Sequence, residues 1–308
     1  MIQAITVTNR LGESLRMELA YPSLSMNYAI SSITGLDPVK ADINTTEMAT
    51  RDGALYNSSR LSSRNIVLKI IFVNDLAYGT IEQMRQRLYK YFPIKQNVVL
   101  TVEGEERIGQ ASGYVESVEV DMFDNMEYAQ ISVVCPDPYF YSAGADGIII
   151  VVFYGSEPAF EFPFSNESLT EPLIEFGIIK QNTEQTITYD GDDEVGIIIQ
   201  IHALGEAEDI TIYNLETRER MEIDTSIIAT LTGSGIVAGD DITICTMRGS
   251  KSITLLRGGV TYNILNALGR NADWFQLVKG DNIFAYTAES GLPNLQFEIA
   301  YQIIYDGM

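Results

Sequence analysis

The only histidine is the first residue to consider for chemistry, because an imidazole can act as a general base or a metal ligand near neutral pH. His202 stands in the stretch GIIIQIHALG, among mostly apolar neighbours. A lone histidine on an apolar strand, without a partner Cys or second His, is typical of a packed residue. The sequence therefore predicts a structural role for His202 and gives no support to a histidine-dependent catalytic triad.

Carboxylates are the second group with chemical potential, since the chain has 42 acidic residues. The densest cluster is YDGDDEVG at 189–196, which lacks the ligand spacing of a calcium-binding loop. A solvated turn is the stronger interpretation, and a weak cation site stays open. A facing pair of carboxylates at glycosidase distance also stays open, because chance alone could place one on a β-rich fold.

The sequence contains no convincing cofactor motif. The glycines of GSGIVAG at 233–239 have one residue too many for a dinucleotide fingerprint, and strands rather than a helix are expected around them. Cys135 and Cys245 are far apart and form no CxxC pair, which argues against a disulfide framework and a zinc site. We expect no catalytic residue, no cofactor and no metal.

The single tryptophan lies in DWFQLVKGDNIFAYTAESG at 273–291. Trp274 could be a stacking platform for a sugar ring or an ordinary packing residue of a β-sheet. Glycine and aspartate at Gly280-Asp281 predict a hairpin turn between two apolar runs, and a large aromatic residue stabilises cross-strand packing. A structural role for Trp274, Gly280 and Asp281 is favoured, and the glycan platform is kept as the alternative.

The totals indicate what kind of chain positions these residues. A length of 308 residues suits two domains, and abundant Ile, Val, Thr, Tyr and Phe favour β-structure. The formal charge of −22 disfavours binding to nucleic acid or to an anionic membrane. The first residues alternate like a strand and show no export signal, so we expect synthesis in the cytoplasm.

A long polar segment interrupts the first half. Residues 35–64 have no clear period and carry turn residues at Asp37-Pro38 and Asp52-Gly53, which predicts a long loop or an extended hairpin. Segments of this length in a compact domain are usually functional or disordered. We interpret this one as a contact arm, with these candidate inter-subunit residues: Asp42, Asn44, Arg51, Tyr56 and Arg60.

The remaining pattern divides the chain in two. Thr80 and Gln83 form a capping box before an apolar stripe that ends at Pro93, which predicts one helix among the strands of the first half. The prolines and glycine of CPDPYFYSAG end this pattern, so we place domains at 1–142 and 143–308. Short strands separated by turns predict a β-sandwich for the second domain, closing with one strand from Leu295 to Asp306.

The ordered set of segments resembles the distal tail proteins of long-tailed bacteriophages. In the first half the resemblance rests on GLDPV, RDGALYNSSRLSSRNIVLKIIF, TIEQMRQRLYKYF and AQISVVCPDPYFY. In the second half it rests on IYNLETRERMEI, GDDITICTMRGSKSITL, NADWFQLVKGDNIFAYTAESG and the closing YQIIYDGM. The resemblance covers nearly the whole chain, and no block is long enough for an added arm or sugar-binding insertion.

The resemblance implies a mainly β protein. Its first domain would be a tail-tube-like β-sandwich with one helix and an extended hairpin, and its second a galectin-like β-sandwich. It also implies a hexameric hub ring in the virion, at the tail tip or baseplate. The implied partners are the tail tube protein, the tail hub or tip protein, and receptor-binding or peripheral baseplate proteins, with DNA passing through the lumen without specific binding.

Three functions follow from these observations. A structural assembly protein is favoured, a carbohydrate-binding module for host-wall glycans is the alternative, and a glycoside hydrolase is third. A ring that conducts DNA is expected to have an acidic lining, and two turns of the first half are candidates for it: Glu103 to Glu106 and Asp121 to Glu127.

Overall fold

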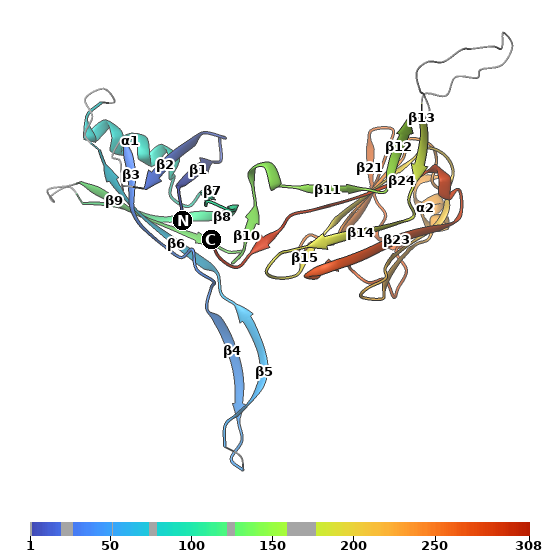
Figure 1. Ribbon diagram of the computed structural model, residues 1–308, viewed down its shortest axis with the longest axis horizontal. Helices are drawn as coiled ribbons and strands as arrows, with labels where there is room; N and C mark the ends of the chain where they lie inside the picture. The colour runs from blue at the N-terminus through green and yellow to red at the C-terminus, as the bar shows by residue number, and fades with distance from the viewer. Residues whose placement is uncertain (1, 20–26, 51, 74–78, 122–126, 159–176) are drawn as a thin grey trace, which may run out of the picture. The chain divides into compact units, whose positions relative to one another are not determined.

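The chain forms two compact units in a computed structural model, which describes residues 2–19, 27–50, 52–73, 79–121, 127–158 and 177–308 (Figure 1). The first unit comprises Met1–Gly147 and Ile304–Met308, and the second comprises Ile148–Ile303. The mainly β architecture, with a helix in the first unit and packed sheets in the second, confirms the predicted fold class.

The first unit is built on one sheet that closes on itself. Its order is β25-β10-β8-β7-β1-β2-β3-β6-β9, and β8 also pairs with β9, so that seven of the strands form a closed barrel. All neighbours are antiparallel except β2 and β3. The strands are β1 (Ala4–Asn9), β2 (Ser14–Leu19), β3 (Tyr28–Thr34), β6 (Arg64–Phe72), β7 (Asn97–Glu103), β8 (Ile108–Asp121), β9 (Tyr128–Cys135), β10 (Phe140–Ser142) and β25 (Ile304–Tyr305).

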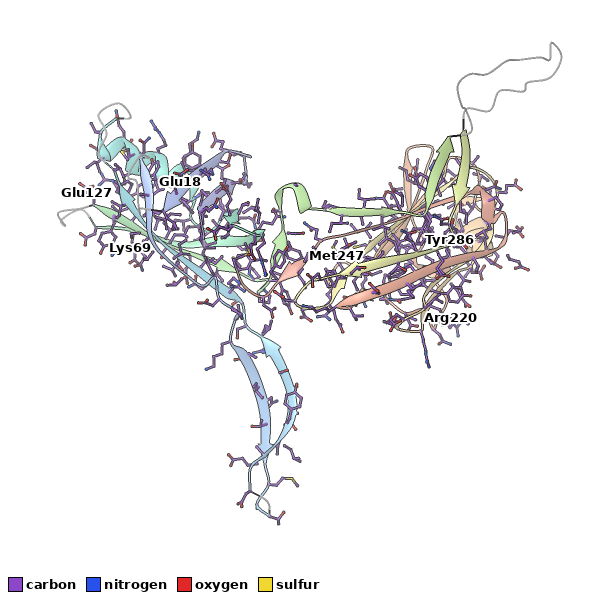
Figure 2. The ribbon with its side chains drawn as sticks, viewed as in Figure 1. Glu18, Lys69, Glu127, Arg220, Met247 and Tyr286 are labelled. Carbon is purple, nitrogen blue, oxygen red and sulfur yellow. The ribbon has the colours of Figure 1, made fainter. Side chains whose placement is uncertain are left out.

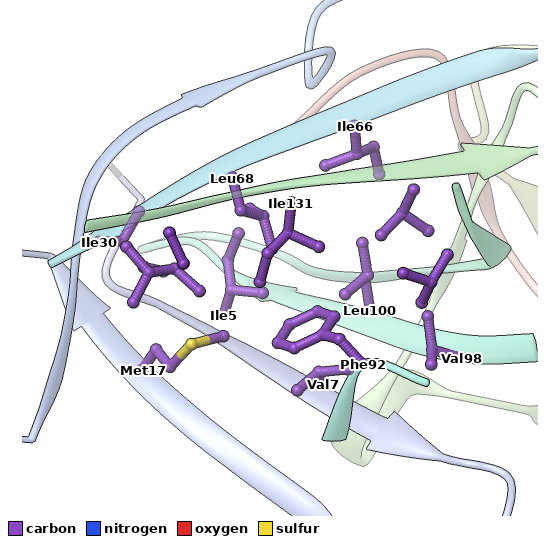
Figure 3. Close-up of a cluster of buried hydrophobic side chains, with 14 of the residues drawn as sticks. Ile5, Val7, Met17, Ile30, Ile66, Leu68, Phe92, Val98, Leu100 and Ile131 are labelled. Carbon is purple, nitrogen blue, oxygen red and sulfur yellow. The ribbon is translucent and has the colours of Figure 1, made fainter. Parts of the chain in front are cut away.

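Alternating residues fill the barrel interior. Along β6, Ile66, Leu68 and Ile70 are fully buried, while Val67 and Lys69 between them are half-buried. This period of two is that of a strand with one face in the core. Figure 3 shows Ile66 and Leu68 converging with Ile5, Leu100 and others on a single apolar cluster, to which Ile70 also belongs.

Helix α1 (Ile81–Tyr91) covers part of this core through Met84 and Leu88. It begins at the predicted capping box, because the Thr80 hydroxyl accepts from Gln83 N and the Gln83 side chain accepts from Thr80 N. The expected helix is confirmed.

A hairpin leaves the barrel between β3 and β6. Strands β4 (Ala41–Glu47) and β5 (Ala54–Leu61) pair only with each other among the described residues. Every described residue of the two strands except the half-buried Ala41 is exposed. Figure 1 shows this hairpin, which we call the arm, projecting from the barrel sheet of its unit.

The second unit consists of two main sheets that pack face to face. The six-stranded sheet runs β11 (Ile149–Val152), β24 (Leu295–Tyr301), β16 (Ile198–Ala203), β19 (Asp241–Cys245), β20 (Ser252–Arg257), β21 (Val260–Asn263). The four-stranded sheet runs β14 (Glu184–Tyr189), β23 (Gly280–Ser290), β17 (Glu208–Asn214), β18 (Glu219–Ile223). Two short pairs join β12 (Tyr154–Pro158) to β13 (Gly177–Gln181), and β15 (Val195–Gly196) to β22 (Gln276–Leu277).

Aromatic rings hold the two sheets together. Tyr286 on β23 stacks on Phe297 of β24 with centroids 4.7 Å apart, and Phe153 contacts both rings edge-on. Figure 2 labels Tyr286 inside this unit. The buried phenol of Tyr286 reaches the Leu295 carbonyl at 3.5 Å, which agrees with the rule that a buried tyrosine hydroxyl finds a polar partner.

Three features differ from the sequence expectations. Helix α2 (Thr225–Thr232) was not expected in the second half. The units divide after Gly147 rather than after Ser142. The expected strand from Leu295 to Asp306 is divided in two, since β24 ends at Tyr301 and β25 pairs with β10 in the first unit.

Candidate functional site

The arm presents two chemically different faces. Residues opposite each other in the register share a face, which groups Ile43 with Ser59, Thr45 with Tyr56, and Ala41 with Leu61. A bulge in the register between Asn44 and Thr45 preserves this grouping, and the Tyr56 hydroxyl lies 2.8 Å from Ser59 Oγ. This first face carries three exposed apolar side chains, with exposed fractions of 65% for Ile43, 64% for Tyr56 and 37% for Leu61.

The opposite face of the arm is mainly polar, with one apolar side chain, Leu55, which is 45% exposed and lies opposite Thr46. Asp42 pairs with Arg60, whose Nε lies 3.5 Å from the carboxylate, and Asn44 faces Ser58. The arm's Asn57 amide also donates to Thr46 Oγ1 at 2.7 Å. Both ends of the Asp42–Arg60 ion pair are well exposed, so that it adds little to folding stability.

The predicted contact residues therefore fall on both faces. Asp42, Asn44 and Arg60 lie on the polar face, and Tyr56 lies on the apolar one. Arg51 lies outside the described residues. The sequence reasoning missed Ile43 and Leu61, whose signal was their alternation with polar residues. Whether any of these residues contacts a second subunit stays a prediction.

A buried arginine holds the base of the arm. Arg64, the first residue of β6, is 2% exposed. Its Nη1 donates to the carbonyls of Gly35 at 2.6 Å and Asp37 at 2.7 Å, in the segment that leads from β3 into the arm. Its Nε donates to Pro138 O at 2.7 Å and its Nη2 to Asp306 O at 2.5 Å.

The environment of Arg64 explains why this charge is tolerated inside. Burial is the main influence and lowers the pKa of the guanidinium, although that group stays charged because arginine starts from a very high value. Four carbonyl oxygens and the Phe140 ring, 4.4 Å from Cζ, replace its hydration. Arg64 thus joins β6 to three other stretches of the first unit, at residues 35–37, 138–140 and 306.

Two further contacts secure the same junction. Met308 N donates to Leu36 O at 3.0 Å, next to the carbonyls that Arg64 binds. Gly35 adopts φ +88°, and a Cβ there would stand 2.0 Å from Asn65 O, so only glycine fits. The backbone turn into the arm is therefore fixed by a glycine, by Arg64 and by residues 304–308.

The expected hairpin at Trp274 does not form. Strand β22 pairs with β15, and β23 pairs with β14 and β17, so the two runs flanking Gly280 join different partners. Asn282 holds the tight connection, since its side chain bonds Val278 N and O. Asp281 accepts from Thr188 at 2.7 Å instead of serving a turn between paired strands.

Trp274 itself is half-buried, with Lys251 Nζ 5.2 Å from its ring, while its neighbour Phe275 is fully buried. Within the described part of the second unit, no aromatic ring belongs to the well-exposed apolar side chains. A platform of several grouped rings is therefore not present around Trp274 in that part of the chain.

The other candidates for chemistry have structural surroundings. In the cluster at 189–196, the Tyr189 hydroxyl donates to Asp193 O and Glu194 pairs with Arg248 at 3.2 Å. The described residues contain no group of three or more His, Cys, Asp or Glu side chains placed to hold a metal ion. The glycines of GSGIVAG end α2 and lead into the loop that Arg257 and the buried Asp240 hold in place.

His202 lies at the surface rather than in the core. Its Nδ1 is 2.6 Å from Asp241 Oδ1, and both side chains are more than two-fifths exposed. The core interpretation of His202 is therefore wrong, because its strand alternates and the histidine falls on the outward face. A hollow of about 460 Å³ lies over this face of the six-stranded sheet.

The two turns proposed for a ring lining are partly described. Glu103 is held by Arg16, which lowers the carboxyl pKa, and Arg16 also binds Glu18 at 2.6 Å. Residues 122–126 of the second turn lie outside the described residues. The facing of both turns stays a prediction. Among the helices of the described chain, none is long and apolar enough to cross a membrane.

Comparison with known proteins identifies the first unit. Residues 23–148 match the family model described as the phage tail protein RIFT-related domain. No curated protein sequence matches the chain.

Solved structures resemble the whole chain. The Dit protein (gp 19.1) of phage SPP1 is described as a paradigm of the hub adsorption apparatus in phages that infect Gram-positive bacteria. It matches with a TM-score of 0.63 at 14% identity, over 97% of this chain and 98% of that one. A chain of the phage p2 baseplate, in its activated conformation with Sr, matches with a TM-score of 0.48 at 9% identity over 97% of both chains. Residues 23–148 therefore carry a phage tail protein RIFT-related domain, and the chain as a whole has the fold of the phage SPP1 Dit protein.

Proposed function

We propose that the chain is a structural hub protein of a phage tail tip or baseplate. Six copies form a closed ring that joins the tail tube to the tip and to the receptor-binding apparatus. The observation that carries this proposal is the arm: a two-stranded hairpin, exposed along its described length, that projects from a phage tail domain.

The arm suits a contact with a neighbouring copy. Eight residues of strand span about 27 Å, so the hairpin reaches beyond its own barrel. An isolated two-stranded hairpin is marginally stable in water, and its apolar face, Ile43, Tyr56 and Leu61, has no cover among the described residues. A head-to-tail contact in which each arm lies on the next subunit generates a ring when the rotation closes.

The partners follow from this position. The ring contacts the tail tube protein on one side and the hub or tip protein on the other, and peripheral or receptor-binding baseplate proteins attach around it. The protein is then part of the virion, synthesised in the host cytoplasm, and DNA passes through the lumen without specific binding. The role is structural and involves no catalysis.

Native mass measurement of arm variants tests the proposal. Replacing Ile43 and Tyr56 with serine removes the two most exposed apolar side chains of the arm and is expected to convert rings to monomers. Leu11→Ser is the matched control, because Leu11 is 74% exposed in the turn after β1 and lies outside the arm. Full rings from the Ile43/Tyr56 variant would show that the apolar face of the arm does not hold the subunits together. A monomeric unaltered protein would refute the ring itself.

A further inference from the structure

The hollow over the six-stranded sheet has a floor of ordered polar side chains. Strands β24, β16 and β19 lie side by side, and their register aligns two rows across them. Gln296, His202 and Asp241 form one row, while Glu298, Gln200 and Thr243 form the next. Neighbouring strands are about 4.8 Å apart, so each row spaces its groups at about the width of one sugar ring. We call this site the sheet hollow.

Most of this hydrogen-bonding capacity is unused. Within the described part of the chain, four of the floor side chains make no hydrogen bond or ion pair: Gln200, Thr243, Gln296 and Glu298. Some surface carboxylates of the same unit are paired, as Glu222 is with Arg220. The floor therefore offers free donors and free acceptors together in one place.

The histidine adds a fixed acceptor. The Asp241 carboxylate accepts from His202 Nδ1 at 2.6 Å, so the proton of the neutral ring is on Nδ1. His202 Nε2 is then left with a lone pair. Asp241 acts here as a positioning residue, because it fixes the tautomer and the orientation of the imidazole.

Apolar walls flank this polar floor. Tyr154 lines one edge and Leu256, which is 41% exposed, lines the other. An aromatic ring beside polar side chains can stack on the C–H face of a sugar while the polar groups bind its hydroxyls. The volume of about 460 Å³ lies in the range of small-molecule sites.

The charge of the lining selects among ligands. The side chains that line the sheet hollow include Asp241 and Glu298, and no Lys or Arg is among them. Phosphate or carboxylate ligands would be repelled, since they need cationic or N–H partners. An apolar ligand would leave the polar floor dehydrated and unpaired. A neutral polyol supplies both donors and acceptors and suffers neither penalty.

We propose that the sheet hollow is a binding subsite for a neutral saccharide, a hexose or an N-acetylhexosamine. Gln200, Thr243 and Gln296 bind its hydroxyls, Glu298 and His202 Nε2 accept from them, and Tyr154 covers one ring face. The site is separate from Trp274, which does not line the hollow. It goes beyond the hub function and does not depend on ring formation.

Calorimetric titration of the full chain with matched sugars tests this proposal. We expect millimolar binding of galactose, glucose or N-acetylglucosamine, and at least about tenfold weaker binding of galacturonic or glucuronic acid, which differ from their parent sugars by one carboxylate. No heat and no sugar-dependent hydrogen-exchange protection of β16, β19 and β24 at about 50 mM of every neutral sugar would overturn it. So would equal binding of the acidic and neutral members of a pair.

Variants locate the binding. Gln200→Leu together with Thr243→Val replaces two floor groups with apolar ones and is expected to weaken the sugar at least about tenfold. Thr254→Val is the matched control, because Thr254 pairs with Thr243 on the next strand but does not line the hollow. Loss of binding in Trp274→Leu with unchanged binding in the floor variant would move the site elsewhere and refute the proposal.

The hydrogen-exchange measurement on the unaltered protein decides the case if the floor variant fails to fold. The Ile43/Tyr56 arm variant separates this proposal from the hub function. It should bind the same sugar with the same affinity, whether or not it assembles. A ring-forming protein without saccharide binding would refute only the sheet hollow, and a saccharide-binding monomer would refute only the ring.

Discussion

Replacing Arg64 by methionine is expected to destabilise the first unit at the junction beneath the arm. Methionine keeps the unbranched stem of the side chain but removes all four hydrogen bonds to Gly35, Asp37, Pro138 and Asp306. Hydrogen bonds from a charged donor contribute about 1.5–3 kcal/mol each, which gives roughly 6–12 kcal/mol before desolvation. Burying the guanidinium costs several kcal/mol, and some carbonyls regain water in the variant.

The net loss is therefore about 3–5 kcal/mol, the range found when one partner of a buried charged network is removed. For a unit of this size, each kcal/mol moves the melting temperature by about 2–4 °C. Calorimetry should show the transition of the first unit lower by roughly 6–20 °C, while that of the second unit stays in place. Hydrogen exchange should speed up in β10 and β25.

Arg60→Met is the control for this experiment. Arg60 is also an arginine near the arm's base, but its side chain is 83% exposed and its ion pair with Asp42 is long. We expect a change below about 0.5 kcal/mol. Equal melting temperatures for the Arg64 and Arg60 variants would refute the idea that the buried guanidinium organises the junction.

Three further outcomes are expected. Burial raises the pKa of Tyr28 to about 12, and its hydroxyl donates to Met84 O, so its stabilising effect is complete below pH 10 and is lost as the pH rises to 12. The free energy of unfolding of the unaltered protein should fall between pH 9 and 11.5, and Tyr28→Phe should make this fall smaller by roughly 2 kcal/mol. An equal fall in both proteins would contradict the raised pKa of Tyr28. Burial likewise raises the pKa of the Cys135 thiol to about 11. A thiol reagent at pH 8 should therefore label the half-buried Cys245 of the native protein and react with Cys135 only after unfolding. Labelling of Cys135 in the native protein would show that the barrel interior is open. Rings of a protein with formal charge −22 should persist or grow more abundant as sodium chloride is raised to about 500 mM, measured by native mass or light scattering, because screening weakens their mutual repulsion; dissociation with salt would count against an acidic lining.

Local signals in the sequence predicted several elements of the fold. The capping box at Thr80 and the apolar stripe after it defined α1, and turn residues with no apolar period marked the arm. Both depend on residues that are close in the sequence, since the capping box joins Thr80 to Gln83 and the arm pairs residues at most 20 positions apart. Helix α2 also had such a signal, an Asp224 cap and a Gly233 end at φ +89°, but its β-branched residues Thr225, Ile227 and Ile228 favour strands.

Long-range contacts account for what the sequence could not predict. Arg64 stands at the start of a strand like any surface arginine, and its burial depends on carbonyls from residues as distant as Asp306. The partners of β22 and β23 are likewise far away, which is why the flanks of Gly280 do not pair with each other. The floor of the sheet hollow is formed by residues of β16, β19 and β24, which are far apart in the sequence, so no single sequence motif indicates the site.

The distance along the chain between Arg64 and Asp306 also sets an order of events during synthesis. The two residues are 242 positions apart, and ribosomes add about 5–20 residues per second. Asp306 is therefore made about 12–50 seconds after Arg64, and all of Ile148–Ile303 is made in between. The second unit can fold on the ribosome while the barrel still lacks β25 and the last acceptor for its buried arginine. A nascent chain thus carries an arm whose base stays incomplete until translation has passed the second unit.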